Sequence, residues 1–160
     1  MIIQVRKLGC PGHEEFAVGA VAETGKIFEA DYAATYGATP DYIQRTAQRE
    51  MERIRRYRRE FTPSRGPIDP KDRIVILVDD GIATGATLRA AIEAVRERHP
   101  KKIVVASPVG APDSVKTIRG LADEVVCLST PPHFSAVGQW YRNFPQVQDS
   151  EVKRVMQSCK

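Results

Sequence analysis

Two adjacent carboxylates and a short loop of small residues are the part of this sequence best suited to chemistry. Asp79 and Asp80 directly follow the apolar run 74–78, and the loop 83–87 comes soon after them. Ionised carboxylates only accept hydrogen bonds, so the pair suits the adjacent hydroxyls of a sugar. The small side chains of the loop let backbone N–H groups approach an anion closely, and a helix N-terminus favours negative charge. The sequence therefore predicts a site for a phosphorylated sugar.

The elements that would position this site are a strand before it and a helix after it. The run 74–78 is unbroken and rich in β-branched residues, which is typical of a strand buried on both faces of a parallel sheet. Apolar residues then recur on one face of a helix: Leu88, Ala91, Ile92 and Val95. This period argues against a plain hairpin turn at Asp80-Gly81. Two other interpretations remain. Thr84 could be only a helix N-cap, and the acidic pair could be a magnesium site.

The string from Val75 to Leu88 resembles the PRPP-binding signature of type I phosphoribosyltransferases, where PRPP is 5-phosphoribosyl 1-pyrophosphate. One position departs from the signature, because Gly81 stands where an aliphatic residue is usual. The resemblance implies that Asp79 and Asp80 are catalytic residues that hold the ribose 2′- and 3′-hydroxyls. It also implies a cradle for the 5′-phosphate formed by Ala83, Thr84, Gly85, Ala86 and Thr87.

The resemblance extends over nearly the whole chain, to a prokaryotic group usually called predicted phosphoribosyltransferases. Similar stretches are Val5–Gly9 with Pro11–His13 at the start and Val137–Tyr141 through Asp149 at the end. Enzymes of the family carry an earlier strand and a pyrophosphate loop, roughly Pro-Arg-Gly-Gly in this group, and the sequence contains no such loop. We therefore expect a domain that lacks its first strand: either an N-terminal portion belongs to another chain or was lost, or the protein has only half of the PRPP site. An uncovered strand edge tends to pair with another chain, so we also expect self-association, most simply as a dimer.

Two cations near the start of the chain are the next candidates. In the family, a basic pair in a comparable place contacts pyrophosphate, which assigns Arg6 to PRPP binding and Lys7 to catalysis. Cations there would stabilise the charge that develops on a departing pyrophosphate. Without the resemblance they are ordinary surface cations at a strand end. His13 and Glu14, in the same expected loop, could act as acid and base or simply be exposed.

Composition indicates one soluble domain over residues 1–160. Hydrophobic content is 42% and charged content 28%, and no apolar stretch approaches the roughly 20 residues that span a bilayer. No signal peptide is visible. Three cysteines, Cys10, Cys127 and Cys159, are too few and too far apart for a disulfide framework or a zinc site, which favours a reducing cytoplasm. Cys127 is expected in the core, and Cys10 as a passive or a reactive thiol in a loop.

The net charge of +4 comes from one helix. Residues 44–59 hold seven arginines and two glutamates, a local net of +5, so the rest of the chain is near −1. Apolar residues at helical spacing give this segment a buried face and a basic outer face. A solvated charged face is the first interpretation, and an anionic ligand or a partner surface is the second. Nucleic-acid binding comes third, because no aromatic platform or binding motif accompanies the charge.

Strands alternate with helices along the chain. The expected order is a strand at 2–5, a loop at 6–15, a strand at 16–22, a mixed segment at 24–42, a helix to about Glu60, a connector at 62–72, a strand at 74–78, a helix at 86–99, a strand at 102–107, a helix at 112–121, a strand at 124–129 and an irregular segment at 130–148. This order predicts a three-layer α/β/α fold with a mainly parallel sheet, of the type I phosphoribosyltransferase kind. The aromatic set Phe134, Trp140, Tyr141 and Phe144 could stack on an acceptor base or pin the tail.

The implied activity is transfer of the 5-phosphoribosyl group from PRPP to a nitrogen acceptor, a base or an amine, with release of pyrophosphate in nucleotide metabolism. Magnesium would be carried by PRPP, so no protein metal ligand is assigned. The alternatives are a non-catalytic protein that senses PRPP or a nucleotide, and a degenerate structural subunit. The complete acidic pair and loop argue against the last. We expect PRPP and a small-molecule acceptor as partners, but neither a membrane nor nucleic acid.

Overall fold

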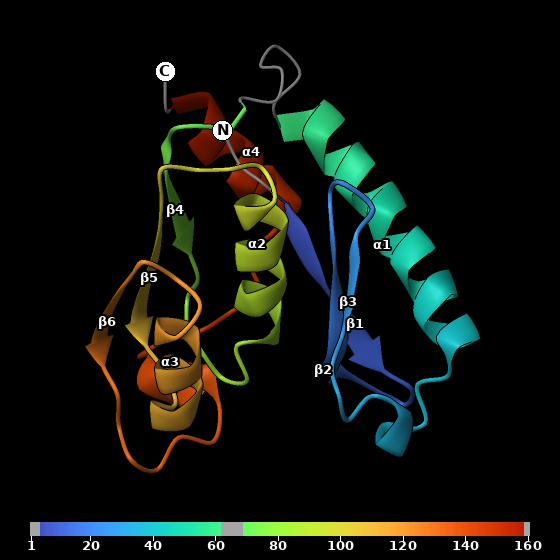
Figure 1. Cartoon of the computed structure of the whole chain (residues 1–160), viewed down its shortest axis with the longest axis horizontal. Helices are drawn as coiled ribbons and strands as arrows, with labels where there is room; N and C mark the ends of the chain where they lie inside the picture. Colours follow the sequence, from blue (N-terminus) through green and yellow to red (C-terminus); the bar gives the residue numbers. More distant parts are fainter. Residues whose placement is uncertain (1–3, 62–68, 159–160) are drawn as a thin grey trace.

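Two three-stranded sheets and four α-helices make up the described part of the chain (Figure 1). The structure, a computed structural model, describes residues 4–61 and 69–158. The elements in chain order are β1 (Val5–Cys10), β2 (His13–Ala22), β3 (Ile27–Glu29), a 3₁₀ turn (Ala34–Tyr36), α1 (Pro40–Phe61), β4 (Ile74–Val78), α2 (Ala86–Arg96), β5 (Lys102–Val109), α3 (Pro112–Arg119), β6 (Glu124–Ser129), a second 3₁₀ turn (Val137–Trp140) and α4 (Asp149–Ser158). The mixed α/β class with a parallel sheet is confirmed.

The first three strands form an antiparallel sheet, in the order β1-β2-β3. Only Pro11 and Gly12 join β1 to β2, and Gly12 adopts a φ of +76°. A connection this short allows a hairpin but not the crossover that parallel strands need. The expected loop at 6–15 is therefore wrong, since most of it is strand. Residues 2–3 of the expected strand at 2–5 and residues 62–68 of the expected connector lie outside the described residues.

The last three strands form a parallel sheet, in the order β4-β5-β6. Helices α2 and α3 are the crossovers, as the alternating pattern predicted. Helix α2 ends three residues before the expected end at 99, and His99 adopts a left-handed φ of 51° just before Pro100. A residue before proline is disfavoured in the helical region, so the turn belongs to the approach to β5.

Helix α2 lies between the two sheets and packs on both (Figure 1). Leu88, Ile92 and Val95 belong to the core that also contains residues of β4, β5 and α3. Ala90, on another side of the helix, faces β2 and β3 and is fully buried. The other face of the antiparallel sheet is covered by α1 through a second core. Both faces of the antiparallel sheet are therefore packed.

The parallel sheet is packed on one face only, which corrects the prediction that residues 74–78 are buried on both. Val75 and Leu77 point to the α2 core, whereas Ile74, Ile76 and Val78 are 59%, 61% and 77% exposed. The strand register brings exposed residues of β6 to the same face: Val126 and Leu128. We call the surface formed by these five side chains the bare face. A run of β-branched residues is compatible with a strand buried on both faces. Burial of the second face also requires helices that pack against it, and the run itself does not indicate whether they exist.

Ion pairs connect α1 to the antiparallel sheet and give several of the arginines of α1 a carboxylate partner. Glu50 is buried, and its carboxylate accepts hydrogen bonds from Arg6 Nε at 2.7 Å and Arg53 Nη1 at 2.9 Å. Arg58 pairs with Glu23, which directly follows β2. A buried carboxylate is tolerated only when it is paired, so these arginines are part of the packing. The purely solvated interpretation of this helix is thus too simple.

Candidate active site

The acidic pair lies at the carboxyl end of β4, as predicted. The Asp79 N–H donates to the Ala106 carbonyl at 3.1 Å, which continues the β4–β5 ladder to the last residue before the turn. The Asp80 N–H donates to Asp79 Oδ1 at 3.0 Å. Burial and the neighbouring Asp80 charge raise the pKa of Asp79 to about 6, although the hydrogen bond from the Asp80 N–H opposes the shift. Asp79 is therefore half-buried and holds its proton to a higher pH than an ordinary aspartate, while Asp80 is exposed.

The loop 83–87 is held from below by the parallel sheet and by α3. The Ile82 N–H donates to the Val109 carbonyl at 2.9 Å, and its carbonyl accepts from the Ala111 N–H at 2.8 Å. The Ser114 hydroxyl donates to the Ala83 carbonyl at 2.6 Å. These bonds hold Ile82 and Ala83, where the loop begins, against β5 and α3.

Helix α2 begins directly on this loop. Gly85 is its N-cap, with a left-handed φ of +72° that a side chain would disfavour. The Ala86 N–H donates to Thr84 Oγ1 at 3.4 Å. The first N–H groups of a helix lack partners within the helix and carry the positive end of its dipole. The loop therefore offers hydrogen-bond donors for an anion, and the acidic pair offers hydrogen-bond acceptors for hydroxyl groups. Both lie at one end of the parallel sheet.

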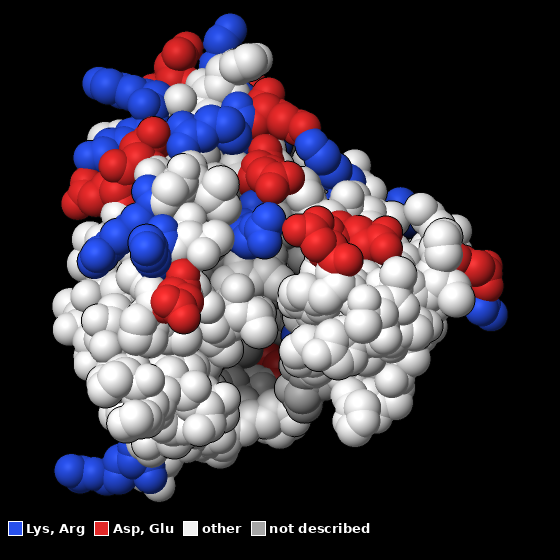
Figure 2. All heavy atoms as spheres, turned by 60° about the horizontal axis from the view of Figure 1, so that its bottom comes forward, with Lys and Arg blue, Asp and Glu red and all other residues white. Residues whose placement is uncertain are grey.

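The end of the molecule that carries this site is hollowed and mostly uncharged. Figure 2 views the side that is lowest in Figure 1, toward which the arrows of β4, β5 and β6 point. Most lysines and arginines lie in the upper half of this view, with one further basic group at the lower left, and acidic atoms are visible inside the hollow. No helix in the described parts of the chain is long and apolar enough to cross a membrane. Nor do the residues at 4–61 and 69–158 include three or more His, Cys, Asp or Glu side chains grouped to hold a metal ion.

The two cations of β1 point to opposite faces of their strand. Arg6 reaches Glu50 and stacks over the Tyr57 ring, with its guanidinium carbon 5.5 Å from the ring centroid, so it faces α1. Lys7 alternates to the other face and is exposed. The loop 83–87 begins α2, on the side of this sheet away from α1 (Figure 1). The structure therefore joins Asp79, Asp80 and the loop, and directs Arg6 elsewhere.

The other candidates of the hairpin have ordinary surroundings. His13 and Glu14 are exposed at the start of β2. Cys10 is buried, and its thiol lies 3.5 Å from the Tyr36 carbonyl and 3.6 Å from the Pro11 carbonyl. Cys127 lies against the α2 core, as expected.

The aromatic segment of the C-terminal part contacts the acidic pair. The Tyr141 hydroxyl donates to the backbone carbonyl of Asp80 at 2.6 Å. Its ring lies 4.9 Å from that of Phe144, and Phe134 stacks on Trp140 at 6.2 Å. Burial and the nearby Asp80 and Asp79 charges raise the pKa of Tyr141. The sequence named this set without indicating which of its members reaches the site, because 61 residues separate Tyr141 from Asp80.

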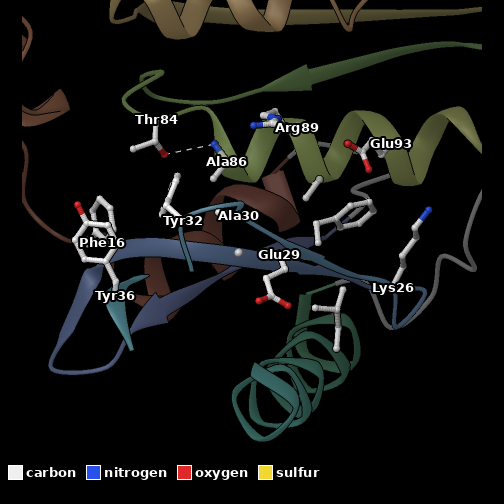
Figure 3. Close-up of a pocket in the computed structure, with 14 residues that line it drawn as sticks. Phe16, Lys26, Glu29, Ala30, Tyr32, Tyr36, Thr84, Ala86, Arg89 and Glu93 are labelled. Atoms are coloured by element: carbon white, nitrogen blue, oxygen red, sulfur yellow. Dashed lines mark hydrogen bonds between the residues drawn. The ribbon is translucent and has the colours of Figure 1, made fainter. Parts of the chain in front are cut away.

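A cavity of about 610 Å³ opens between α2 and the β2–β3 hairpin. Figure 3 shows Phe16, Tyr32 and Tyr36 at the end nearest Thr84, and Lys26 at the other end. The ring centroids of Phe16 and Tyr36 are 4.9 Å apart. Sequence reasoning missed this cavity, since its aromatic residues fall in the hairpin and in the mixed segment 24–42.

Comparison with known proteins agrees with this geometry. Residues 12–144 match the family model described as a phosphoribosyl transferase domain. Two Mycobacterium tuberculosis strains have a protein named "Putative phosphoribosyl transferase" that is 41% identical over 152 residues, which is 94% of this chain and 34% of that protein. The chain thus spans about a third of the length of these relatives. The "Bifunctional protein PyrR" of Clostridium acetobutylicum is 59% identical over only 39 residues, 24% of this chain and 22% of that protein.

A solved structure has a similar fold. The crystal structure of TT1426 from Thermus thermophilus superposes with a TM-score of 0.71 at 41% sequence identity. The match covers 99% of this chain and 75% of TT1426.

Proposed function

Because the chain belongs to the phosphoribosyl transferase domain family, we propose that it binds PRPP at residues 79–87 and transfers the 5-phosphoribosyl group to a nitrogen acceptor, releasing pyrophosphate. The observation that carries this proposal is the junction of an acidic pair with an anion loop. Asp79 and Asp80 end β4, and residues 83–87 lead straight into α2. A ribose 5-phosphate unit needs hydrogen-bond acceptors for its hydroxyls close to hydrogen-bond donors for its phosphate, and this junction offers both.

The two carboxylates would have different tasks. Asp80 is exposed and suited to accept a hydrogen bond from a ribose hydroxyl. Asp79 is half-buried, and its pKa of about 6 lets it exchange a proton near neutral pH. In the transition state the ribose gains positive charge, which ionised carboxylates stabilise.

The negative charge that develops on the departing pyrophosphate must be balanced by cations. Lys7 lies on the face of β1 that does not carry Arg6, and we propose it as the cation nearest the departing pyrophosphate. Magnesium would enter with PRPP, chelated by substrate oxygens and water, because Mg²⁺ commonly keeps several waters and binds through substrate phosphates. Asp79 and Asp80 are hard oxygen ligands that fit such an ion, although we assign the hydroxyl contacts to them first.

Binding and turnover are measured separately. Isothermal titration with PRPP and magnesium tests the site, and a pyrophosphate-release assay across bases and amines tests the reaction. Tight PRPP binding without turnover of any acceptor would favour the alternative, a non-catalytic sensor of PRPP or nucleotides. No binding of PRPP by the wild type would contradict both.

Two substitutions with matched controls locate the site. Asp80→Asn and Thr84→Val should each weaken PRPP binding by about tenfold, because each leaves a ligand group without its partner. Asp41→Asn removes the same charge on α1, and Thr24→Val removes a hydroxyl that accepts the Lys26 N–H at 3.4 Å, as Thr84 accepts the Ala86 N–H. If the controls weaken binding as much as the site variants do, the assignment is wrong.

The acceptor is constrained by one position. In hypoxanthine–guanine enzymes that the sequence resembles, the residue matching Ala83 is an aspartate that assists proton transfer at the purine. Alanine cannot move a proton, so we expect feeble turnover of hypoxanthine and guanine and propose a pyrimidine, an amine or another acceptor. Robust turnover of either purine by the pure protein would overturn this.

A further inference from the structure

The segment 133–144 is held in one shape by a single side chain. Gln139 Oε1 accepts the N–H groups of Ser135 and Ala136 at 3.2 and 3.1 Å, and its Nε2 donates to the His133 carbonyl at 3.1 Å. Outside the short 3₁₀ turn, this segment has no regular structure to fix it. The three bonds of Gln139 connect the start of the segment to the 3₁₀ turn that precedes Tyr141.

This segment touches the turn after β4 at two points. The Tyr141 hydroxyl donates to the Asp80 carbonyl at 2.6 Å. Val137 lies against Gly81, where an added Cβ would come within 2.5 Å of Val137 Cγ1 and 2.7 Å of Cγ2. Val137 therefore fills the space that a side chain at position 81 would need, which explains why this position is glycine here.

The two contacts fix the backbone of Asp80 and leave its carboxylate free. Its N–H is bound by Asp79 Oδ1 and its carbonyl by Tyr141, so both peptide groups around its Cα are held. Across residues 4–61 and 69–158, the Asp80 carboxylate forms neither a hydrogen bond nor an ion pair with any other residue. A held backbone with an unoccupied carboxylate is suited to presenting that carboxylate to a ligand.

We propose that Tyr141 and Val137 are positioning residues, which lock the turn 79–81 so that the Asp80 carboxylate meets the sugar hydroxyls. This rests on the proposed binding of a phosphorylated ribose. The benefit is preorganisation, because a carboxylate already in place loses less conformational freedom on binding than one on a mobile turn. The phosphate loop 83–87 has its own supports from Ile82 and Ser114, so the lock should act on sugar contacts and not on phosphate contacts.

The first test separates sugar from phosphate. Ribose 5-phosphate and inorganic phosphate are titrated separately into wild type and Tyr141→Phe, followed by the amide chemical shifts of Thr84 and Gly85. Loss of the hydroxyl should weaken ribose 5-phosphate binding by about tenfold and leave phosphate binding unchanged. Tyr57→Phe is the matched control, since it removes a 2.7 Å bond to Asp149 between α1 and α4 and should change neither affinity.

Three other results would contradict the positioning role. Unchanged ribose 5-phosphate binding in Tyr141→Phe, or an equal loss for both ligands, would overturn it while leaving the proposed function standing. Failure of the wild type to bind either ligand would overturn the proposed function, and the positioning role with it.

The second test uses the interlock of Gly81 and Val137. Gly81→Ala should weaken ribose 5-phosphate binding by about tenfold or more, because its Cβ pushes the segment and Tyr141 away from the turn. Val137→Ala removes both clashing methyl groups and leaves only a 3.1 Å contact to the Val137 Cβ, so the double variant should regain most of that affinity. A double variant no better than Gly81→Ala, with both folded by circular dichroism, would overturn the interlock.

Discussion

The two sheets of this protein each have three strands and are packed very differently. The antiparallel sheet has α1 on one face and α2 on the other, and every residue of β2 from Ala17 to Ala22 is buried. The parallel sheet shares α2 and adds α3 on the same side, while its other face is bare. The apolar pattern of a strand thus shows which residues can be buried, but what covers them is decided by elements distant in the sequence.

The difference also separates scaffold from site. The sheet with a helix on each face is tied to α1 by ion pairs of partly exposed arginines with two largely buried glutamates, Glu50 and Glu23. The sheet with one covered face carries the acidic pair and the loop 83–87 at its carboxyl end. The candidate site therefore lies on the less completely covered half, and its turn 79–81 is contacted by the irregular segment 133–144.

The largest predicted effect contrasts the two faces of the parallel sheet. Ile103→Ala should lower the free energy of unfolding by about 2 to 5 kcal/mol, because Ile103 is fully buried in the α2 core. Ile76→Ala, on the neighbouring strand, should change it by less than about 0.5 kcal/mol, since that side chain is 61% exposed. Urea denaturation measures both, at protein concentrations low enough to keep the chain monomeric. Equal losses would mean that the bare face is covered within a single chain.

The second prediction concerns the loss of folding stability caused by the ionised carboxylate of Asp79. The folded pKa of Asp79, about 6, lies above its ordinary value of 3.8, so the folded state holds this proton more tightly and loses stability as pH rises through 6. Asp79→Asn should therefore be more stable than the wild type by about 3 kcal/mol at pH 8 and nearly equal at pH 4. Thermal unfolding across pH measures this. A pH-independent difference would show that ionisation of Asp79 is not its cause.

Sequence reasoning succeeded where local signals were complete. Strands at 74–78 and 124–129 and the starts of the helices at 86 and 112 agree with the structure, because helical and strand periods change there at clear turn residues. The hairpin was missed because Pro11-Gly12 was taken as one more loop signal. Helix α4 was not predicted, although Asp149 and Glu151 in its first turn are a recognisable start signal.

The candidate site was predictable in part for the same reason. Its acidic pair and loop are contiguous, so their spacing alone identified them. The contact of Tyr141 with Asp80 and of Arg6 with Glu50 join residues 61 and 44 positions apart, and no local pattern encodes such pairs. Contacts between residues far apart in the sequence depend on how the elements pack, and the sequence pattern does not determine that packing.

The third prediction separates the two cations of β1. Arg6→Gln should lower the free energy of unfolding by about 2 kcal/mol, because it removes a charged hydrogen bond to buried Glu50. Lys7→Gln should leave stability within about 0.5 kcal/mol and instead weaken PRPP binding. Denaturation and titration of both variants provide the comparison. Weaker PRPP binding in folded Arg6→Gln would restore Arg6 to the pyrophosphate site.

The smallest expected effect on stability is at the bare face, where the consequence is association. We expect the protein to self-associate through this face, since contiguous exposed apolar patches commonly mark interaction sites. Val78→Lys should shift the protein toward monomer in light scattering while changing stability by less than about 0.5 kcal/mol. Val155→Lys, at an exposed valine of α4, is the control. A monodisperse monomeric wild type would exclude this association.

The position of α2 between the sheets makes the two halves of the chain mutually dependent. A fragment ending before β4 would keep α1 and the antiparallel sheet but expose the face of β2 that α2 buries. A fragment starting at β4 would carry α2 with its alanine side, including fully buried Ala90, turned to water. Each half would therefore be prone to aggregation when expressed alone, and the two should refold only when mixed, as complementary pieces of one cooperative unit.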